Sequence, residues 1–500
     1  MSKTISHKGT FGGGYFVINK EAKTNSFVDG EGFSVTCKDR KGLLNSLTDL
    51  ISKAETYIKL CSFIIDNKQI FELLKKQLAE RQLAVFILTA VDERNIKSDI
   101  LNEDESAEFS SIRHFEYIGE LVKAGAHVRA SSSAHAKFLI KDGNEALLMS
   151  ANLTEPSLVS NQRNKEPNDE SGIQIDDETE IKSLERIFDS IFQYGTEFKK
   201  FVNLSREIQL IDIKDIDISQ TDFPQNDSLL QWTYESFQHS IYEKLNESIS
   251  NGENEIMLST YSIVGLQNLN ESTDCIQSFI KDRNGSVKIF CRAMNHRTDH
   301  ISACTQLSEI GVEIFGDMFN HSKGISVDNK TGMIFTANID GHHGLKNGFE
   351  VGYSLNSSHK SFSKFNSFLN YQIESAPFVF KTSPNKNDVF EFYKLWYAEK
   401  EIKPAPFQTS FEIKYFGNTQ FANEFENGIS NYPIFYSVLK NTDTKEFQFE
   451  INGKAYLLRE INSTTFEVRK ENKGQDIFRG EKYLLFYNTI NLTVIWTKRN

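Results

Sequence analysis

Short apolar runs alternate with longer segments of helical periodicity over roughly the first 380 residues of the chain. Residues 85–88 (Val-Phe-Ile-Leu) are apolar at every position, which is typical of a strand buried on both faces. Residues 181–191 and 362–369 carry apolar side chains three or four positions apart, which predicts amphipathic helices. Because strands and helices alternate, the pattern predicts an α/β fold with a mixed or mostly parallel sheet flanked by helices.

The hydrophobic period changes to two near the C-terminus. Phe447, Phe449 and Ile451 alternate with polar residues and lead into Asn452 and Gly453, a dipeptide typical of a hairpin turn. Similar alternation continues to the end of the chain. We therefore predict that a small antiparallel β domain closes the sequence.

The chain is internally repeated. Residues 121–128 align with residues 307–314 at an offset of 186, and residues 57–63 align with residues 255–261 at an offset of 198. The strands persist while the loops differ in length, so we predict two similar lobes related by a pseudo-two-fold axis. The predicted domains are a first lobe (1–203), a second lobe (204–385), a helical linker (386–404) and the C-terminal β-rich domain (405–500).

Composition limits the classes of protein to which the chain can belong. Of its 500 residues 39% are hydrophobic, 25% are charged and 8 are prolines, which excludes a disordered or collagen-like chain. No apolar run approaches the roughly 20 residues of a membrane helix, and the first residues lack an apolar signal core. Five cysteines without a Cys-x-x-Cys pair indicate reduced thiols. We expect a cytoplasmic protein that does not bind a membrane.

The charge is unevenly distributed. The whole chain has a net charge of −12, the wrong sign for a general nucleic-acid coat. Residues 401–500 contain 13 basic and 12 acidic residues, which leaves 43 basic and 56 acidic residues in the first 400. The last hundred residues are therefore electrostatically distinct, as expected for a separate module.

One set of polar residues recurs in both halves at the constant offset of 186. A lone His-x-Lys is expected about once by chance with 11 histidines. Two sets that also share an Asp, a small hydroxyl residue and an Asn at fixed spacing are not expected by chance. Packing alone does not require them either. The sets are His135, Lys137, Asp142, Ser150 and Asn152, and His321, Lys323, Asp328, Thr336 and Asn338; Glu170 and Glu350 follow them in matching Glu-x-Gly sequences.

These residue types suit chemistry at phosphorus. A neutral imidazole can attack a phosphodiester and hold the phosphoryl group covalently, while a second, protonated imidazole donates to the leaving oxygen. Lysine, asparagine and hydroxyl groups can donate to the non-bridging oxygens. Glu170 and Glu350 could each hold a motif histidine by its other ring nitrogen and so set its tautomer. Because lysines supply the positive charge, we expect no metal and no other cofactor.

Over roughly residues 35–380 the paired motifs resemble the phospholipase D superfamily, with its HxK(x)4D signature. The resemblance implies that the two motifs meet across one cleft between the lobes and act through a phosphohistidine, with His135 as the favoured nucleophile. It also implies that Asp142 and Asp328, although members of the candidate catalytic set, mostly brace the motif loops. Met149 and Phe335 stand where the family often has a glycine.

The family includes phospholipases, phospholipid synthases and nucleases, so the fold alone does not name the substrate. The C-terminal module resembles, in a general way, the β-rich DNA-reading domain of metal-independent restriction-type nucleases. We therefore predict a nuclease that cleaves DNA or RNA. A phospholipase or phosphatidyltransferase is the enzyme alternative, and a gated nucleic-acid-binding protein that needs a partner is the non-enzyme alternative.

Polar and basic residues follow each motif and are candidate substrate-binding groups. They are Arg163 and Lys165 in the first half, and His342, His343 and Lys346 in the second. The expected partner is a nucleic acid, with a partner protein as a further possibility for the C-terminal domain, which could equally be a dimerisation or packing module. One chain contains both motifs, so a monomer suffices for one active site.

Overall fold

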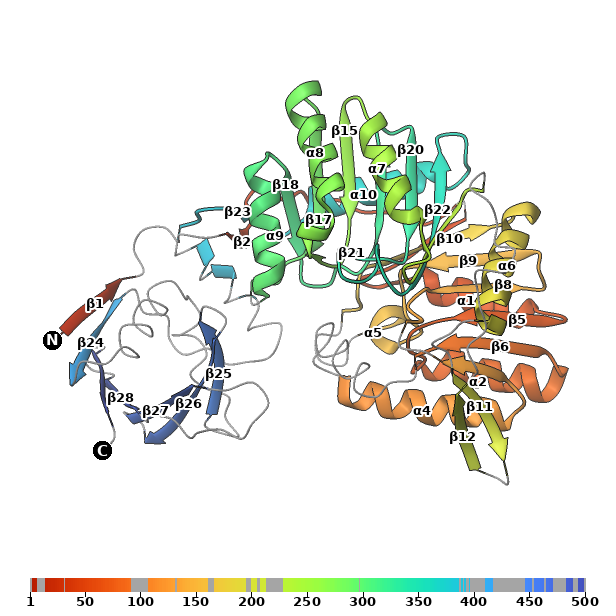
Figure 1. The fold of residues 1–500 in the computed structure, drawn as a ribbon, viewed down its shortest axis with the longest axis horizontal. Coiled ribbons are helices and arrows are strands. Elements are labelled where there is room, and N and C mark those ends of the chain that lie inside the picture. The colour runs from red at the N-terminus through yellow and green to blue at the C-terminus, as the bar shows by residue number, and fades with distance from the viewer. Residues whose placement is uncertain are drawn as a thin grey trace. The chain divides into compact units, whose positions relative to one another are not determined.

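The computed structural model divides the chain into two compact units. The large unit comprises Glu21–Ala293 and Gln306–Pro377, and the small unit comprises Met1–Lys20, Met294–Thr305 and Phe378–Asn500. The fold is mixed α/β, with large sheets flanked by helices (Figure 1), which confirms the predicted class. The described residues are 2–6, 14–30, 32–90, 107–130, 133–160, 166–194, 199–204, 207–212, 228–295, 297–385, 388–389, 391–392, 395, 410–416, 446–451, 454–462, 465–470, 483–488 and 493–498.

The first half of the large unit is built on a sheet of order β12-β11-β7-β6-β5-β8-β9-β10-β3-β4. The strands β5, β6 and β7 run parallel, and β8, β9, β10 and β3 continue the sheet antiparallel. The bounds are β3 (Phe33–Cys37), β4 (Arg40–Lys41), β5 (Tyr57–Cys61), β6 (Ala84–Thr89), β7 (His127–Ala130), β8 (Phe138–Lys141), β9 (Glu145–Met149), β10 (Glu170–Ile175), β11 (Lys199–Leu204) and β12 (Glu207–Asp212).

Helices cover both faces of this sheet. One face packs against α1 (Gly42–Lys53), α2 (Lys68–Lys76), which continues into the π-helix η1 (Gln77–Arg81), and α4 (Ala107–Lys123). The other face packs against α6 (Glu178–Tyr194), and the short α5 (Glu155–Leu158) follows β9. The apolar stripe of residues 181–191 is buried, so the helix predicted there is confirmed. Successive β8 residues, Phe138 and Leu139, lie in different clusters, as expected for a strand buried on both faces.

The second half repeats this topology. Read from β18, its strands follow the order β18-β17-β15-β19-β20-β22-β13-β14, which matches β7-β6-β5-β8-β9-β10-β3-β4 strand for strand. The strands are β13 (Leu230–Tyr234), β14 (Gln238–His239), β15 (Glu255–Ser259), β17 (Ser286–Arg292), β18 (Glu313–Asp317), β19 (Gly324–Val327), β20 (Thr331–Phe335) and β22 (Phe349–Asn356). The helices are α7 (Ser240–Asn251), η3 (Leu266–Asn268), α8 (Asn270–Arg283) and α10 (Phe362–Ser375), together with α9 (Thr298–Glu309), most of which belongs to the small unit. Strand β16 (Ile263–Val264) pairs with β21 (Ile339–Asp340).

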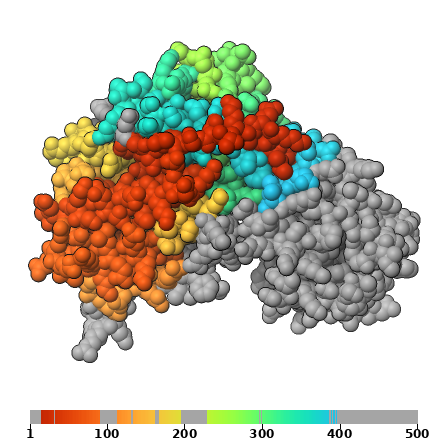
Figure 2. All heavy atoms as spheres, turned by 180° about the vertical axis from the view of Figure 1, so that it is seen from behind, coloured from red at the N-terminus to blue at the C-terminus, as the bar shows by residue number. Residues whose placement is uncertain are grey.

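The two halves share a hydrophobic core. The cluster that contains the buried stripe of α6 also contains the stripe of α10 and residues of β22. A segment near residue 27 lies along α10: Phe27 packs edge-on against Phe368 with ring centroids 5.2 Å apart, and the backbone N–H of Lys23 donates to Glu374 O at 2.8 Å. In the space-filling view this segment is part of the red band beside the cyan residues of the second half (Figure 2). The halves are therefore held together by a shared hydrophobic core and by this segment.

The small unit contains a sheet of order β1-β24-β29-β28-β27-β26-β25. Its strands are β1 (Ser2–Ser6), β24 (Ser410–Phe416), β25 (Glu446–Ile451), β26 (Lys454–Asn462), β27 (Thr465–Lys470), β28 (Tyr483–Asn488) and β29 (Thr493–Lys498). The pairing is antiparallel except between β24 and β29. Strand β25 coincides with the alternating run at residues 447–451, whereas the Asn452-Gly453 turn lies outside the described residues.

In the small unit, two strands near the N-terminus pair with strands that lie far along the chain. The N-terminal β1 joins the C-terminal sheet by pairing with β24, and β2 (Tyr15–Ile18) pairs with β23 (Phe378–Lys381).

In the large unit, the hairpin β11–β12 extends the first sheet past residue 203, where the sequence places a domain boundary. Most of the linker predicted at 386–404 lies outside the described residues. Within the described part of the chain, no helix is long and apolar enough to cross a membrane.

Candidate active site

Each His-x-Lys segment immediately precedes a strand that runs antiparallel to the central parallel strands. Strand β8 pairs with β5, with Cys61 opposite Phe138, so His135 and Lys137 lie at the carboxyl end of β5. Strand β19 pairs with β15 in the same way, with Ser259 opposite Gly324. The carboxyl edge of parallel strands is where α/β folds commonly place functional groups.

The two motif segments also pair with the opposite half of the chain. The backbone N–H of His135 donates to Phe349 O at 3.2 Å, and Phe349 N–H donates to Ser133 O at 2.7 Å. In the other half, His321 N–H donates to Asp169 O at 2.9 Å, within a bridge between Asp169 and Asn320. Each histidine is thus held by a strand or strand end of the opposite half.

Each motif histidine shares a hydrogen bond with a glutamate of the opposite half. Nδ1 of His135 lies 2.5 Å from Oε1 of Glu350, and Nδ1 of His321 lies 2.8 Å from Oε1 of Glu170. The Ser150 hydroxyl donates to the second oxygen of Glu170 at 2.5 Å, and the Thr336 hydroxyl donates to that of Glu350. With Nδ1 engaged by a carboxylate, Nε2 is the nitrogen left for chemistry at either histidine.

The two histidines differ in accessibility. The His135 side chain is 22% exposed, whereas that of His321 is 2% exposed. An aromatic ring packs edge-on against each of them: Phe63 against His135 at 5.4 Å between centroids, and Tyr261 against His321 at 5.3 Å. Sequence reasoning did not select these rings, although the repeat at offset 198 places them at equivalent positions.

The buried carboxylates carry negative charge. Burial alone would raise the pKa of Glu170, but the neighbouring charge and hydrogen bond of His321, the Lys323 ammonium and the Ser150 hydroxyl together lower it below the usual value. The pKa of Glu350 is lowered in the same way: burial raises it, and His135, Lys137 and the Thr336 hydroxyl outweigh burial. Each glutamate therefore neutralises groups of the opposite half.

The motif lysines are buried beside their own histidines. Nζ of Lys137 lies 3.1 and 3.2 Å from the two ring nitrogens of His135 and donates to its carbonyl oxygen at 2.5 Å. Nζ of Lys323 donates to His321 O at 2.8 Å. With one imidazole protonated, two ammonium groups and two carboxylates leave one positive charge, which matches the single negative charge of a phosphodiester.

The motif asparagines carry unsatisfied amide atoms. Oδ1 of Asn152 and Oδ1 of Asn338 are buried and have no hydrogen-bond partner among the described residues. A buried polar atom without a partner is costly, and rotation of the amide by a half-turn would present an N–H donor at the same place. Both amides are therefore suited to bind a phosphoryl group.

The motif aspartates lie at the other end of the motif strands. The four residues of β8 separate Lys137 from Asp142, a distance of about 13 Å or more along a strand. Asp142 accepts hydrogen bonds from the backbone N–H groups of residues 55–57 at 2.8–2.9 Å, and Asp328 from those of residues 253–255 at 2.7–2.9 Å. Their carboxylates hold the loops that enter β5 and β15, which are the contacts expected of bracing groups.

Glycines on the neighbouring strands accommodate Met149 and Phe335. Met149 pairs with Gly172, where an added Cβ would come within 3.0 Å of Met149 Cβ. Phe335 pairs with Gly352, where the corresponding distance is 3.1 Å. The close backbone approach beside the motif is therefore provided by the glycine that follows Glu170 or Glu350 by two residues.

Residues 47–192 match the family model described as "Cardiolipin synthase, PLD-like domain". This match identifies residues 47–192 as a PLD-like domain of the phospholipase D superfamily. Phosphatidylserine synthase from Haemophilus influenzae shares the fold over 79% of this chain and 97% of its own, with a TM-score of 0.50 and 9% identity. None of the curated proteins matches the sequence significantly.

Two further structures are similar over smaller parts or at lower scores. Nuc from Salmonella typhimurium, a phospholipase D family member, is 20% identical, with 30% of this chain and 96% of its own covered and a TM-score of 0.26. Polyphosphate kinase from Porphyromonas gingivalis is 12% identical, with 76% of this chain and 57% of its own covered and a TM-score of 0.46. The PLD-like domain match supports activity on phosphodiester bonds and leaves the substrate class open.

Of the predicted substrate-binding residues, His342, His343 and Lys346 lie within the described part of the chain. Arg163 and Lys165 lie outside the described residues. The His342 ring contacts the side-chain amides of residues 267 and 268 at 3.2 Å, and His343 is exposed. Nζ of Lys346 lies 3.4 Å from the ring centroid of Tyr242, and burial lowers the pKa of this lysine. Their role in substrate binding stays a prediction.

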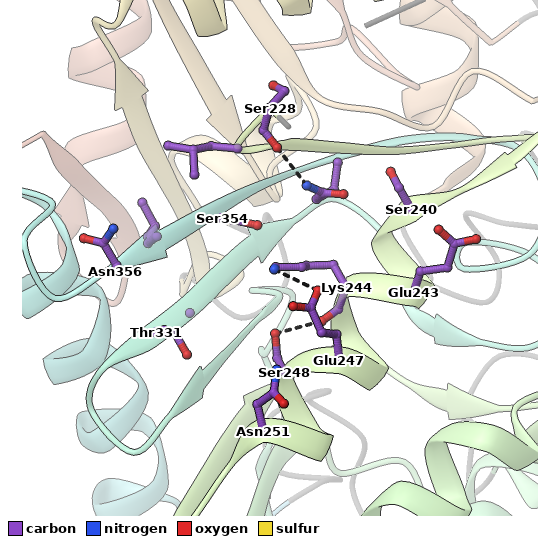
Figure 3. Close-up of a pocket in the computed structure, with 14 residues that line it drawn as sticks. Ser228, Ser240, Glu243, Lys244, Glu247, Ser248, Asn251, Thr331, Ser354 and Asn356 are labelled. Carbon is purple, nitrogen blue, oxygen red and sulfur yellow. Dashed lines mark hydrogen bonds and ion pairs between the residues drawn. The ribbon is translucent and has the colours of Figure 1, made fainter. Parts of the chain in front are cut away.

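A polar hollow of about 650 Å³ lies at the far end of the second sheet (Figure 3). It is lined by one face of α7 and by the ends of β20 and β22 that are remote from Thr336 and Glu350. Polar side chains on this face of α7 bond to one another, for example in the 2.9 Å ion pair between Lys244 and Glu247. The hollow contains none of the motif residues.

Proposed function

We propose that the protein is a metal-independent phosphodiesterase that acts through a phosphohistidine, with nucleic acid as its substrate. The observation that carries this proposal is the crossed pairing of His135 with Glu350 and of His321 with Glu170. Two imidazoles whose Nδ1 atoms are held by carboxylates present their Nε2 atoms for nucleophilic attack and for proton transfer.

In the first step, Nε2 of neutral His135 attacks phosphorus while its Nδ1–H donates to Glu350. The bond from phosphorus to the leaving oxygen breaks, and Nε2–H of protonated His321 gives its proton to that oxygen. In the second step, neutral His321 takes a proton from water, the resulting hydroxide attacks phosphorus, and the P–N bond breaks. Both histidines return to their starting protonation states, so no redox partner is required.

The greater exposure of His135 supports its assignment as the nucleophile. A nucleophile must reach phosphorus in line with the leaving group, and the His135 side chain is 22% exposed against 2% for His321. Lys137 Nζ, 3.2 Å from Nε2 of His135, is placed to contact phosphoryl oxygens bound at that nitrogen. The developing negative charge would then be met by a fixed cation.

Nucleic acid is proposed as the substrate on the strength of the small unit. Six of the seven strands of its sheet lie within residues 401–500, which lack the negative excess of the first 400. A module of this kind can contribute phosphate contacts that an acidic catalytic unit cannot supply. None of the five cysteines is in a disulfide, which fits our further proposal of a cytoplasmic location.

One assay separates the substrate classes. Labelled DNA, labelled RNA and phosphatidylcholine vesicles are incubated with the full chain in the presence of a chelator. We expect cleavage of nucleic acid and no release of choline. Choline release without nucleic-acid cleavage would contradict the nuclease proposal and favour a lipid enzyme, whereas DNA retardation without cleavage would favour a binding protein.

A further inference from the structure

A buried network of polar side chains lies behind His321. Its members are on three elements of the second half: the end of β15, the motif segment before β19, and α10. Asn320 donates through Nδ2 to Thr260 O at 2.7 Å and accepts from Ser322 Oγ at 2.9 Å. Gln372 on α10 donates to Asn320 Oδ1 at 3.1 Å and to Ser322 Oγ at 2.8 Å, and Ser322 also meets Ser259 at 2.8 Å.

The four side chains of this network are at most 1% exposed. Polar groups are buried at a cost that only satisfied hydrogen bonds offset, so the arrangement is stable in few geometries. Asn320 and Ser322 flank His321 in the chain, and Asn320 Oδ1 also accepts from the backbone N–H of Ser322 at 3.2 Å. The network therefore fixes the backbone on both sides of the imidazole.

The first half has no such network at the equivalent positions, all of which are described. The strand and motif repeats, at offsets of 198 and 186, place Cys61, Ala134 and Ala136 where the second half has Ser259, Asn320 and Ser322. The buried stripes of α6 and α10 align at an offset of 181, which places Ile191 at the position of Gln372. These four residues of the first half belong to one hydrophobic cluster.

We propose that Asn320, Ser322 and Gln372 are positioning residues that hold His321 as the proton donor to the leaving oxygen. The inference rests on the proposed function and deepens it. The His135 segment has apolar side-chain support and is positioned by Glu350, by backbone hydrogen bonds with Phe349 and by packing, which suits a nucleophile that must follow phosphorus. The polar network fixes His321 in one position, which suits a proton donor whose distance to the leaving oxygen decides the rate of cleavage.

This assignment predicts a dependence on the leaving group. A nucleoside alkoxide is a poor leaving group and needs the proton, whereas p-nitrophenolate leaves without it. Loss of the positioning network should therefore slow cleavage of an oligonucleotide and spare bis(p-nitrophenyl) phosphate. A purely structural network would affect both substrates alike.

The test compares two substitutions on α10. Gln372→Met removes the network's link to the helix, and Asn366→Met is its matched control: Asn366 is also buried on α10 and accepts from the Ser326 hydroxyl of β19 at 2.6 Å, four residues beyond Ser322. Single-turnover rates of the full chain, with enzyme in excess, isolate the first step. We expect Gln372→Met to slow oligonucleotide cleavage about tenfold or more and to change p-nitrophenolate release less than about twofold.

The control and a second variant decide between the outcomes. Asn366→Met should leave the ratio of the two rates unchanged, with unfolding temperatures measured for both variants. Should Gln372→Met fail to fold, Ser322→Ala, which places the alanine of the first half in the second, takes its place. Equal slowing of both substrates by Gln372→Met or Ser322→Ala would overturn the positioning role. A wild type that cleaves neither substrate would overturn the proposed function itself, and the positioning role with it.

Discussion

Glu350 Oε1 lies 2.5 Å from Nδ1 of His135, although the two residues are 215 positions apart in the chain. The equivalent contact, between Glu170 of the first half and His321 of the second, joins residues 151 positions apart. Each half therefore supplies the carboxylate that orients the histidine of the other. Neither half contains a complete acid–base unit by itself.

We expect His135→Ala and His321→Ala each to reduce turnover by about a thousandfold or more, because each removes an indispensable group from one reaction. Steady-state rates on an oligonucleotide measure the loss, and circular dichroism checks the fold. The double variant should be no slower than about the slower single variant. Near-normal activity of either single variant would refute the paired-histidine mechanism.

Glu350→Gln and Glu170→Gln keep the shape of each site and remove the charge that stabilises the imidazolium. We expect kcat to fall by about 10²–10⁴-fold in both variants, with a smaller change in KM. Because the amide can still hydrogen-bond to Nδ1, the fold should survive. A change confined to KM would show that these glutamates bind substrate rather than orient the histidines.

Activity should survive an excess of EDTA. Lys137 and Lys323 are buried beside the motif histidines and supply the positive charge that a divalent ion would otherwise supply. The measurement is the cleavage rate of labelled DNA after dialysis against chelator. Loss of activity that Mg²⁺ or Zn²⁺ restores would contradict the proposed chemistry.

Asp142 and Asp328 should affect stability under acid rather than catalysis. Burial raises the pKa of each carboxyl, but hydrogen bonds from the loops that enter β5 and β15 outweigh burial and lower the pKa below the usual value. A lowered folded-state pKa contributes stability that is present above the unfolded-state pKa and is lost as the pH falls through the folded-state pKa. Asp142→Asn should therefore destabilise the protein at pH 7, by about 1–3 kcal/mol, and flatten its loss of stability on acidification.

The measurement for Asp142 is the unfolding free energy from pH 7 to pH 3. Asp328→Asn should behave in the same way. Asp299→Asn is the control, because the Asp299 side chain is 55% exposed and its ion pair is with Arg297 alone among the ion pairs described. If the single variants lost turnover without losing stability, the aspartates would have a chemical role.

The small unit should contribute the salt-dependent part of nucleic-acid binding. Removal of 405–500 deletes β24, the partner of β1, so residues 1–6 should be removed with it. The shortened chain should still hydrolyse bis(p-nitrophenyl) phosphate, while its affinity for DNA falls and depends less steeply on salt. Solubility and circular dichroism check the fold first, and unchanged DNA binding would show that the recognition surface lies elsewhere.

The sequence by itself determined the fold class, the repeat and the members of the motif. Apolar periodicity marked strand β6 and helix α6 because a buried element must present apolar side chains at its own structural period. The motif could be found because duplication copied His135, Lys137 and Asn152 at a constant offset, which local packing does not require.

Only the tertiary structure decided how these residues work together. Spacing along the chain does not show which glutamate contacts which histidine. Each of these contacts joins the two halves of the chain, so it depends on how the halves pack against each other. The family resemblance implied that Asp142 braces a motif loop, but only the structure showed that it lies at the far end of β8 and accepts from the backbone of residues 55–57. The polar network around His321 could not be predicted from the sequence either. Gln372 lies on α10, about 50 positions from Asn320 and Ser322, and only the fold brings the three buried side chains into hydrogen-bonding contact.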